Sequence, residues 1–478
     1  MSARAMASGR VAMDARARLD ISDVLDDLGH PRAAASWATI AYELATAAGD
    51  DRTAALAAFA TLSLASVLRE DDRATWRRHS DAALARVDDP ALTAEYWRAV
   101  SWAAAAERRA DEAEEALRRA IAVSDSVDQP LARVGDLLDL GETMLIRHRY
   151  AEALALHREA YELAAQVAGP RHPIALRVRG ELANSLLFVD AEAARRELDV
   201  LLVEVPAVLG EESSAYAAVL ARYGTLELRA NELDAGIAHI ERSTEIFARI
   251  HGPWSSAQAA NRYQLGYAHL VRGDSVRAEV ELREALAIQE RVDSDGPAIV
   301  QPAIALASIA SDRQDWKTAI ALMRRALSVL GDDPSDGRIA EVLYQLAAAE
   351  LDSGDFEAAR TTVARALPIT AASFGTPSNR MAELRALVAD LHEHDGDVVA
   401  AIAEYREVEA MMLASPPMRW RGIGFARGRL AELQWKAGDR REARAMAGAA
   451  IQAYEQAEGT AEAIAVLRTW LAEHPLRR

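Results

Sequence analysis

The stretch Gly266–Ala285, GYAHLVRGDSVRAEVELREA, decides the fold of this 478-residue chain. It places Gly266 inside one helical pattern and places Ala278 and Ala285 seven residues apart in the next, with the polar turn RGDS between the two patterns. A glycine in a helix interior costs about 0.5–1 kcal/mol relative to alanine, so something local must offset that cost. We predict that the three small residues are packing notches where helices cross, and not places where a ligand approaches the backbone.

The same spacing recurs along the chain about every 40 residues. Each unit has one amphipathic helical pattern, a Gly/Asp turn, a second amphipathic pattern and a longer loop that often holds proline. A single hairpin of helices cannot bury its own apolar face, so successive units must stack. The unit around Ala194 fits by spacing more than by residue type. The first small residue of each unit falls at Ala34, Thr75, Ala113, Ala153, Ala194, Gly236, Ala278, Ala319, Ala359, Ala401 and Ala443.

The pattern predicts an all-α protein, an α-solenoid of about eleven antiparallel helix hairpins over residues 14–459 with a concave inner wall. Residues 460–478 have no partner hairpin after them and are predicted to form a capping helix and tail, and residues 1–13 are predicted to be disordered. Two places are expected to interrupt the superhelix. The turn within Leu182–Leu202 is shortened, and Pro368 should bend or end its helix because it removes a backbone hydrogen bond.

Composition excludes several classes of function. The net charge of −18 repels phosphate backbones and anionic lipid, which argues against nucleic acid or membrane partners. The absence of cysteine removes disulfides, thiolate zinc sites and cysteine nucleophiles. No segment approaches 18 uncharged apolar residues, so the expected location is cytoplasmic.

Three motifs were weighed as sites of chemistry. The run GIGFARG (Gly422–Gly428) lacks the preceding strand and the Lys-Ser/Thr of a phosphate-binding loop, and we predict a loop that enters a helix. His392 and His394 lie two residues apart, so they point in different directions on a helix and do not suggest a metal site. Tryptophans such as Trp316 are predicted to pack between helices. No nucleophile comes with its base, so we predict no enzyme and no cofactor.

The spacing of small residues resembles that of the tetratricopeptide repeat, over roughly residues 15–475. The family's small residue in the first helix and two alanines in the second appear here with separations of 12 and 7. A period near 42 residues resembles the kinesin-light-chain type. The C-terminal half also resembles the repeat region of bacterial serine/threonine protein kinases, although no kinase catalytic motif is present. The matching triplets are Gly141/Ala153/Ala160, Gly266/Ala278/Ala285, Ala307/Ala319/Ala326, Ala347/Ala359/Ala366 and Ala431/Ala443/Ala450.

The resemblance also implies where a ligand would bind. In tetratricopeptide domains, contacts come from the first helix, three and two residues before the small residue and one and five after it. Amides at these positions can bond a peptide backbone, tyrosines can cover side chains and arginines can hold a carboxylate. The alternative is that these residues only fill a solvated groove. The implied peptide-binding residues are Tyr263, Gln264, Tyr267, Tyr344, Gln345, Asn184, Arg222 and Arg229.

The function that follows from the resemblance is a non-catalytic scaffold for protein–protein interaction. Its concave surface would bind a protein segment or peptide, with a role in kinase-linked signalling and a serine/threonine kinase or its pathway as partner. The alternative is a regulatory sensor whose superhelix binds a small signalling peptide and changes conformation.

Overall fold

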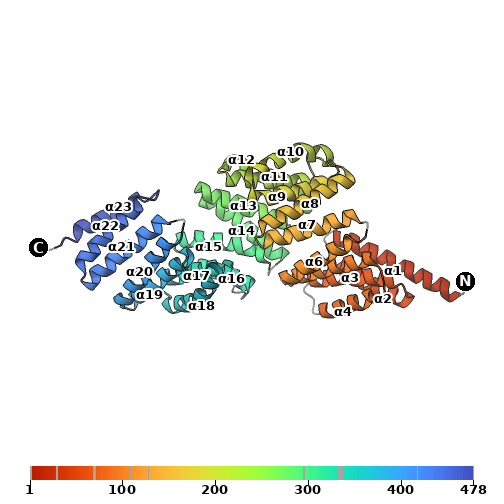
Figure 1. Cartoon of the computed structure of the whole chain (residues 1–478), viewed down its shortest axis with the longest axis horizontal. Helices are drawn as coiled ribbons and strands as arrows, with labels where there is room; N and C mark the ends of the chain where they lie inside the picture. Colours follow the sequence, from red (N-terminus) through yellow and green to blue (C-terminus); the bar gives the residue numbers. More distant parts are fainter. Residues whose placement is uncertain are drawn as a thin grey trace. The chain divides into compact units, whose positions relative to one another are not determined.

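The computed structural model describes residues 3–27, 31–67, 72–107, 109–127, 129–293, 296–331, 337–416 and 418–476. Within these ranges the chain forms 23 α-helices and one 3-10 turn, and no strand (Figure 1). The chain divides into two compact units, Met1–Ile246 and Phe247–Arg478. The boundary falls inside helix α12 (Leu233–His251).

The first unit is a stack of helix hairpins in which consecutive helices pack against each other. Its helices are α1 (Ala3–Asp27), α2 (Pro31–Ala48), α3 (Asp51–Val67), α4 (Arg73–Leu84), α5 (Pro90–Ala106), α6 (Ala110–Ser124), α7 (Pro130–Ile146), α8 (Tyr150–Ala168), α9 (Pro173–Val189), α10 (Ala191–Leu209), α11 (Ser214–Arg229) and the first part of α12.

The second unit repeats the arrangement and ends with the helix α23 lying against α22. Its helices after α12 are α13 (Ser256–Arg272), α14 (Ser275–Val292), the 3-10 turn η1 (Pro297–Ile299), α15 (Val300–Asp312), α16 (Trp316–Leu330), α17 (Gly337–Asp352), α18 (Phe356–Phe374), α19 (Asn379–His394), α20 (Val398–Ala414), α21 (Trp420–Ala437), α22 (Arg440–Tyr454) and α23 (Ala461–Glu473).

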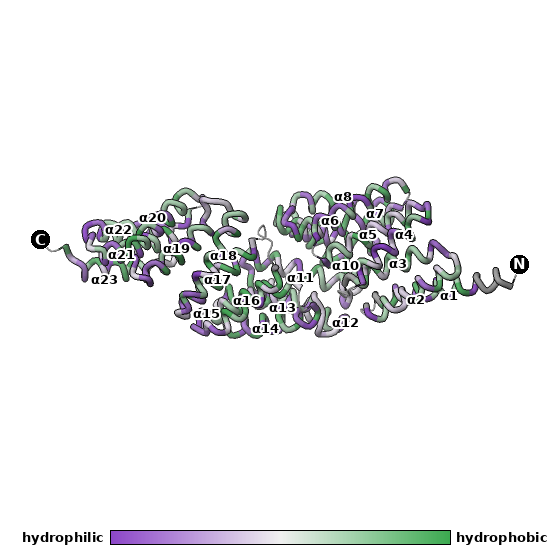
Figure 2. The backbone as a smooth tube through the Cα atoms, turned by 90° about the horizontal axis from the view of Figure 1, so that it is seen from below, coloured by the Kyte–Doolittle hydropathy of each residue, from purple (hydrophilic) through white to green (hydrophobic). Residues whose placement is uncertain are grey.

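The predicted helical-hairpin fold is confirmed. Each of the eleven predicted small residues lies on a different even-numbered helix, from α2 to α22, so each marks the second helix of one hairpin. Apolar and polar residues alternate along every helix, because one stripe of each helix faces its neighbours (Figure 2).

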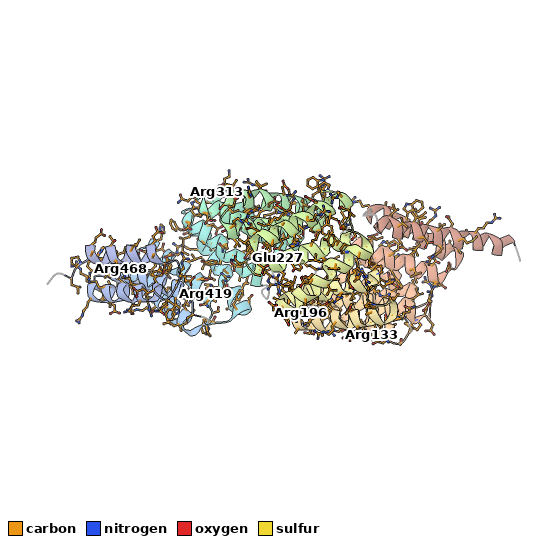
Figure 3. All side chains as sticks on the ribbon, turned by 90° about the horizontal axis from the view of Figure 1, so that it is seen from above. Arg133, Arg196, Glu227, Arg313, Arg419 and Arg468 are labelled. Atoms are coloured by element: carbon orange, nitrogen blue, oxygen red, sulfur yellow. The ribbon has the colours of Figure 1, made fainter. Side chains whose placement is uncertain are left out.

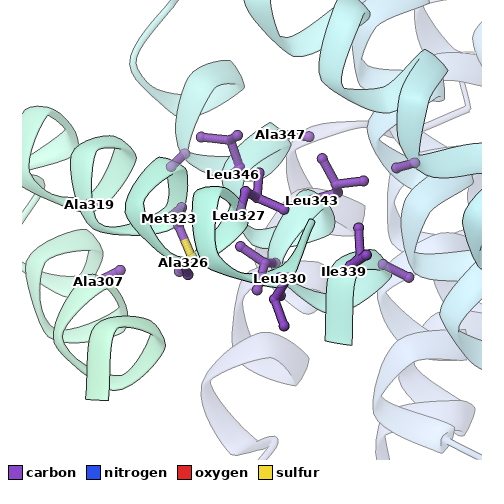
Figure 4. Packing of buried hydrophobic residues seen from close by; sticks show 14 of the residues in the cluster. Ala307, Ala319, Met323, Ala326, Leu327, Leu330, Ile339, Leu343, Leu346 and Ala347 are labelled. Atoms are coloured by element: carbon purple, nitrogen blue, oxygen red, sulfur yellow. The ribbon is translucent and has the colours of Figure 1, made fainter. Parts of the chain in front are cut away.

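Small residues set how closely the helices approach. Ala278 and Ala285 are fully buried. A methyl group added to Gly266 would lie 2.6 Å from Cγ of Leu282 and 3.2 Å from the carbonyl oxygen of Ala278, so the predicted packing notch between α13 and α14 is confirmed. The same principle holds across α15, α16 and α17, where buried alanines surround Met323 and Leu327 (Figure 4). At Gly266 the crossing leaves no room even for a methyl group unless Leu282 shifts.

The polar turns repeat as regularly as the helices. In seven of the hairpins the residue before the N-cap of the second helix adopts positive φ, and the N-cap that follows is often an aspartate. The carboxylates of Asp274, Asp315, Asp355 and Asp397 each accept a hydrogen bond from the backbone N–H three residues on. The positive-φ residues of this turn are His148, Asn231, Gly273, Gln314, Gly354, Gly396 and Gly438.

One predicted register is wrong by a residue. In α4 the marker was placed at Thr75, but the buried residues seven apart are Trp76 and Ala83. Thr75 follows only from the spacing of the neighbouring units, because no pair of alanines seven residues apart marks this unit. Trp76 fills the contact instead. Its ring meets Tyr42 edge to face at 5.3 Å, and its indole N–H donates to Asp72 over 2.9 Å.

Pro368 does not end its helix, contrary to one of the two outcomes predicted for it. Helix α18 continues through Pro368 to Phe374. Ala366, Ile369 and Thr370 are buried on either side of the proline, so packing holds the last turns although one backbone hydrogen bond is lost. The shortened turn is also observed, because Asp190 both follows α9 and caps α10 as a single connecting residue.

The N-terminal segment differs from the predicted disorder, since α1 begins at Ala3. Alanine, arginine and methionine, which are strong helix formers, dominate the sequence of this segment. Residues 1, 2, 477 and 478 lie outside the described residues.

Candidate functional site

The first helix of each hairpin supplies the surface on which a ligand was predicted. We call the surface of the odd-numbered helices the first-helix face. First helices of successive hairpins contact each other directly, for example α7 with α9 and α17 with α19. The small residues pack toward the second helix, and the predicted positions point in other directions around the first helix.

On α13 the three predicted residues differ in availability. Tyr263 is half-buried against Leu282 and Leu306, and its hydroxyl donates to Oε1 of Gln301 over 3.4 Å. Burial, and then the nearby Tyr267, raises the pKa of Tyr263. Gln264 is half-buried, whereas Tyr267 is exposed. Tyr263 therefore joins α13 to α15, and Tyr267 is the one of the three that a partner can reach most easily.

On α17 both predicted residues have neighbours within the second unit. Tyr344 is half-buried, and the guanidinium of Arg380 lies 5.7 Å from its ring centroid. Burial, and then the carboxylate of Glu383, raises the pKa of Tyr344. The amide of Gln345 donates to Glu341 over 3.4 Å.

The three predicted residues of the first unit lie on α9 and α11. Asn184 is half-buried on α9. Arg222 forms an ion pair with Glu181 and fills the space over Gly180, where a methyl group would lie 2.9 Å from its Nη1. Arg229 donates to the carbonyl oxygen of Leu187 over 2.7 Å. Both arginines thus connect α11 to α9. Fewer of their N–H groups are therefore left to bind the ligand carboxylate that was predicted from the sequence.

A large recess of the second unit lies next to Tyr344, among α17 and α19 to α23. It has a volume of about 1000 Å³ and is lined by Tyr344, by Trp420 and by other aromatic and methionine side chains. We call it the terminal groove. Met418, Phe425 and Val466 line it with 47%, 47% and 63% of their side chains exposed. Large apolar side chains exposed side by side mark a binding surface more often than chance placement does.

The glycine run explains why Phe425 was missed. Gly422–Gly428 was predicted to be a loop that enters a helix, but it lies entirely inside α21. Gly424 is a packing notch, since a methyl group there would lie 2.8 Å from the ring of Tyr454 on α22. The alternation of small residues with Phe425 was the signal that could have placed this side chain on the outer side of a helix.

The charges around the terminal groove are mostly paired. Glu383 accepts from Arg380 over 2.8 Å and from Arg419 over 2.6 Å, and Arg419 is labelled in Figure 3. Asp390 accepts from the hydroxyl of Tyr405 over 2.6 Å and from Arg429 over 3.0 Å. Burial, and then Asp390, raises the pKa of Tyr405 well above its usual value. The terminal groove therefore has an apolar floor, which lies between charged side chains that already form ion pairs. Arg421 is exposed at the edge of the groove.

A second electrostatic feature lies on the first-helix face of the first unit. Burial, and then the carboxylates of Glu142 and Asp136, raises the pKa of Asp139 to about 6. Asp136 itself is buried and paired with Arg98. The indole of Trp102 bonds to Asp139. This acidic surface was not among the predicted sites.

The remaining motifs take part in packing. The ring of His394 stacks on Phe356, and Trp435 meets Trp470 edge to face at 5.7 Å. Within the described ranges, no group of three or more histidine, aspartate or glutamate residues is placed to hold a metal ion. In the same ranges, no helix is both long and apolar enough to cross a bilayer.

The geometry defines a class of protein built from stacked helix hairpins. Residues 137–174, which cover most of α7 and α8, match the family model described as tetratricopeptide repeat. The match covers one hairpin, and the spacing of small residues in the other hairpins is similar to that of tetratricopeptide repeats. No curated protein matches the chain.

Several solved structures are similar in part. BtubC (BKLC) from P. vanneervenii is 20% identical, with a TM-score of 0.36 over 46% of this chain and 87% of the other. A putative kinesin light chain with nearly identical TPR-like repeats from Podosopora anserina is 17% identical, with a TM-score of 0.34 over 43% and 97%. The apo form of RapI is 12% identical, with a TM-score of 0.46 over 74% and 97%. No catalytic family is indicated by these comparisons.

Proposed function

We propose that this chain is a non-catalytic scaffold that binds a segment of another protein in the terminal groove. The observation that carries the proposal is the exposure of Met418, Phe425 and Val466 around a recess of about 1000 Å³ on the first-helix face. Covering three large apolar side chains removes them from water and supplies the main driving force for association.

The form of the groove favours an extended or helical peptide over a small compact ligand. Its lining comes from six helices, α17 and α19 to α23, and from the loops that connect some of them, and so it follows the stack instead of closing around a point. Methionine adapts to different partner side chains, and aromatic rings give large contact area for little loss of freedom. Tyr263, Gln264 and Tyr267 on α13 stay a predicted second contact region for a longer segment.

The experiment compares partner recovery by single variants of the full chain. Tagged wild-type protein is used to capture partners from native cells, and mass spectrometry identifies them. Phe425→Ala should reduce recovery of the specific partner about tenfold or more, as truncation of a central aromatic anchor does. Val399→Ala, at an even more exposed apolar residue on α20 that does not line the groove, should leave recovery unchanged.

Two outcomes would contradict the groove as the site. Equal recovery by Phe425→Ala and wild type would remove the groove from the interaction. Loss of the partner with Tyr267→Ala but not with Phe425→Ala would move the site to α13. Circular dichroism of each variant shows whether the helical fold is kept.

The place of the scaffold in kinase-linked signalling stays a prediction from the sequence resemblance, as does the cytoplasmic location. The same capture tests the first point, because a serine/threonine kinase or its substrate would appear among the proteins lost with Phe425→Ala. A short peptide in place of a protein would instead favour the sensor alternative.

A further inference from the structure

Helix α1 has two apolar faces, and only one of them is used within the first unit. The inner face packs on α2 and α3 through Ala15 and Leu19, which are buried. Ser22 on the same face is buried and donates from Oγ to the carbonyl oxygen of Ala34 over 2.9 Å. These contacts fix the rotation of α1 about its axis, and therefore fix which residues point outward.

The outward face carries a continuous apolar stripe. Met13, Ala17, Ile21 and Val24 follow at intervals of 4, 4 and 3 residues, which places them in one line along the helix. Met13, Ile21 and Val24 are 68%, 41% and 56% exposed. An apolar stripe at helical spacing is the pattern by which one helix packs against another, and the stripe has no covering element in the described part of the first unit.

The charged side chains beside the stripe are placed so that they can form ion pairs with those of a second copy of α1 related by a two-fold axis. Arg16 and Asp20 flank it on one side and form an exposed intrahelical pair, with Arg16 Nε 3.2 Å from Asp20 Oδ1. If two copies of α1 lie antiparallel with the axis near residue 19, Met13 faces Val24 of the second copy and Ala17 faces Ile21. In that register Arg16 of each copy comes beside Asp20 of the other. In a parallel two-fold pair, the Arg16/Asp20 flanks of the two copies would lie on opposite sides of the contact, so these residues could not pair with each other.

We propose that two copies of this chain associate through the outer stripe of α1 as an antiparallel helix pair. The small Ala17 near the axis lets the two helices approach closely, and the contact uses the same patch on both copies, as a two-fold dimer requires. The stripe spans eleven residue steps, roughly 16 Å of helix, so the contact is smaller than a standard interface of about 800 Å² per partner. The dimer should therefore be weak and concentration-dependent.

The first test is sedimentation of the full chain between about 1 and about 100 µM, the range over which an association of this size should appear. Wild-type protein should shift from monomer toward dimer. Ile21→Glu should stay monomeric, whereas Val276→Glu, an exposed valine on α14 of the second unit, should behave as wild type. A monomer at every concentration, or a dimer that persists in Ile21→Glu, would overturn the proposal.

The second test fixes the orientation and uses the absence of native cysteine, which leaves no background of disulfides. The double variant Met13→Cys/Val24→Cys should form a covalent dimer on mild oxidation, because residues 13 and 24 of the two copies face each other. Each single variant should stay largely uncrosslinked, since its two thiols would lie about 16 Å apart along the axis. Efficient crosslinking of Met13→Cys alone would show a parallel pair and overturn the antiparallel arrangement.

A charge exchange completes the experiment. Arg16→Asp should weaken the dimer because it places two acids together, and Arg16→Asp/Asp20→Arg should restore it by exchanging the two signs. All of these positions are exposed in the folded chain, so the fold should survive each change, and circular dichroism verifies it. Failure of the double exchange to restore dimerisation would remove the ion pairs from the contact and contradict the register.

Discussion

Ala278 is the residue at which close packing can be measured most directly. It is fully buried, and its carbonyl oxygen lies where a side chain on Gly266 would have to go. We expect Ala278→Leu to destabilise the chain by about 1–3 kcal/mol, because a larger side chain forces α13 and α14 apart. Thermal or urea unfolding measures the change. Val280→Leu, at an exposed position of the same helix, is the matched control and should change stability little. Unchanged stability in Ala278→Leu would contradict the notch.

Asp139 should make stability depend on pH. Its pKa is raised from 3.8 to about 6, so the folded chain holds the proton more tightly than the unfolded chain. The cost of ionising it is absent below pH 3.8, grows as pH rises and is complete above about pH 6. We expect Asp139→Asn to stabilise the chain at pH 7.5 by about 1–2 kcal/mol, after allowance for its partial exposure, and to have little effect near pH 4.

Urea unfolding at the two pH values checks this sign. Glu241→Gln, which removes an exposed carboxylate elsewhere in the first unit, is the control and should show no comparable difference between the two conditions. A benefit of Asp139→Asn that is equal at both pH values would contradict the ionisation argument, and it would indicate a change in packing instead.

At the scale of the helix and its turn, the positive-φ position gives a reciprocal pair of variants. Gln314 and Gly354 occupy the same position of successive hairpin turns, with φ of 60° and 85°. Glycine adopts this conformation without the steric cost that a side chain imposes. We expect Gln314→Gly to stabilise the chain by about 0.5–1 kcal/mol and Gly354→Gln to destabilise it by at least as much. Thermal unfolding measures both, and effects of the same sign would contradict the argument.

The helices and turns were largely predictable because they depend on local spacing. Ala278 and Ala285 indicate a buried stripe, and the Gly-Asp turns indicate where one helix ends and the next is capped. The prediction errors occur where contacts with neighbouring residues, and not the local spacing, determine the structure. Trp76 occupies the contact expected for a small residue because its ring packs against Tyr42 and its indole N–H donates a hydrogen bond to Asp72. Pro368 stays inside α18 because buried residues on both sides hold the helix together.

The candidate site was less predictable than the fold for the same reason. The position rule placed Tyr267 and Tyr344 on the first-helix face, but it could not show that Arg222 would pair with Glu181. That ion pair joins side chains on different hairpins, 41 residues apart. The terminal groove likewise depends on how α23 lies against α22, so the sequence could place Phe425 on the outer side of a helix but could not show that a groove forms around it.

For the whole molecule, the repeat architecture predicts that disturbances stay local. Each hairpin is held mainly by its immediate neighbours, so stability is close to a sum of repeat and interface contributions. Ala160 in α8 of the first unit and Ala326 in α16 of the second are both fully buried alanines of the same repeat position. They are therefore a matched pair of positions for measuring how far along the chain the effect of one substitution extends.

We expect Ala326→Leu to lower hydrogen-exchange protection in α15 to α18 and to leave α7 to α10 unchanged, while Ala160→Leu should do the reverse. The physical reason is that overpacking opens the hairpin it occupies and loosens only the helices that share its interface. Hydrogen exchange followed by mass spectrometry resolves these segments, and Val276→Leu, at an exposed position, controls for the added methylene itself. Loss of protection along the entire chain in either variant would show that the two units unfold as one cooperative body, and would contradict a nearest-neighbour stack.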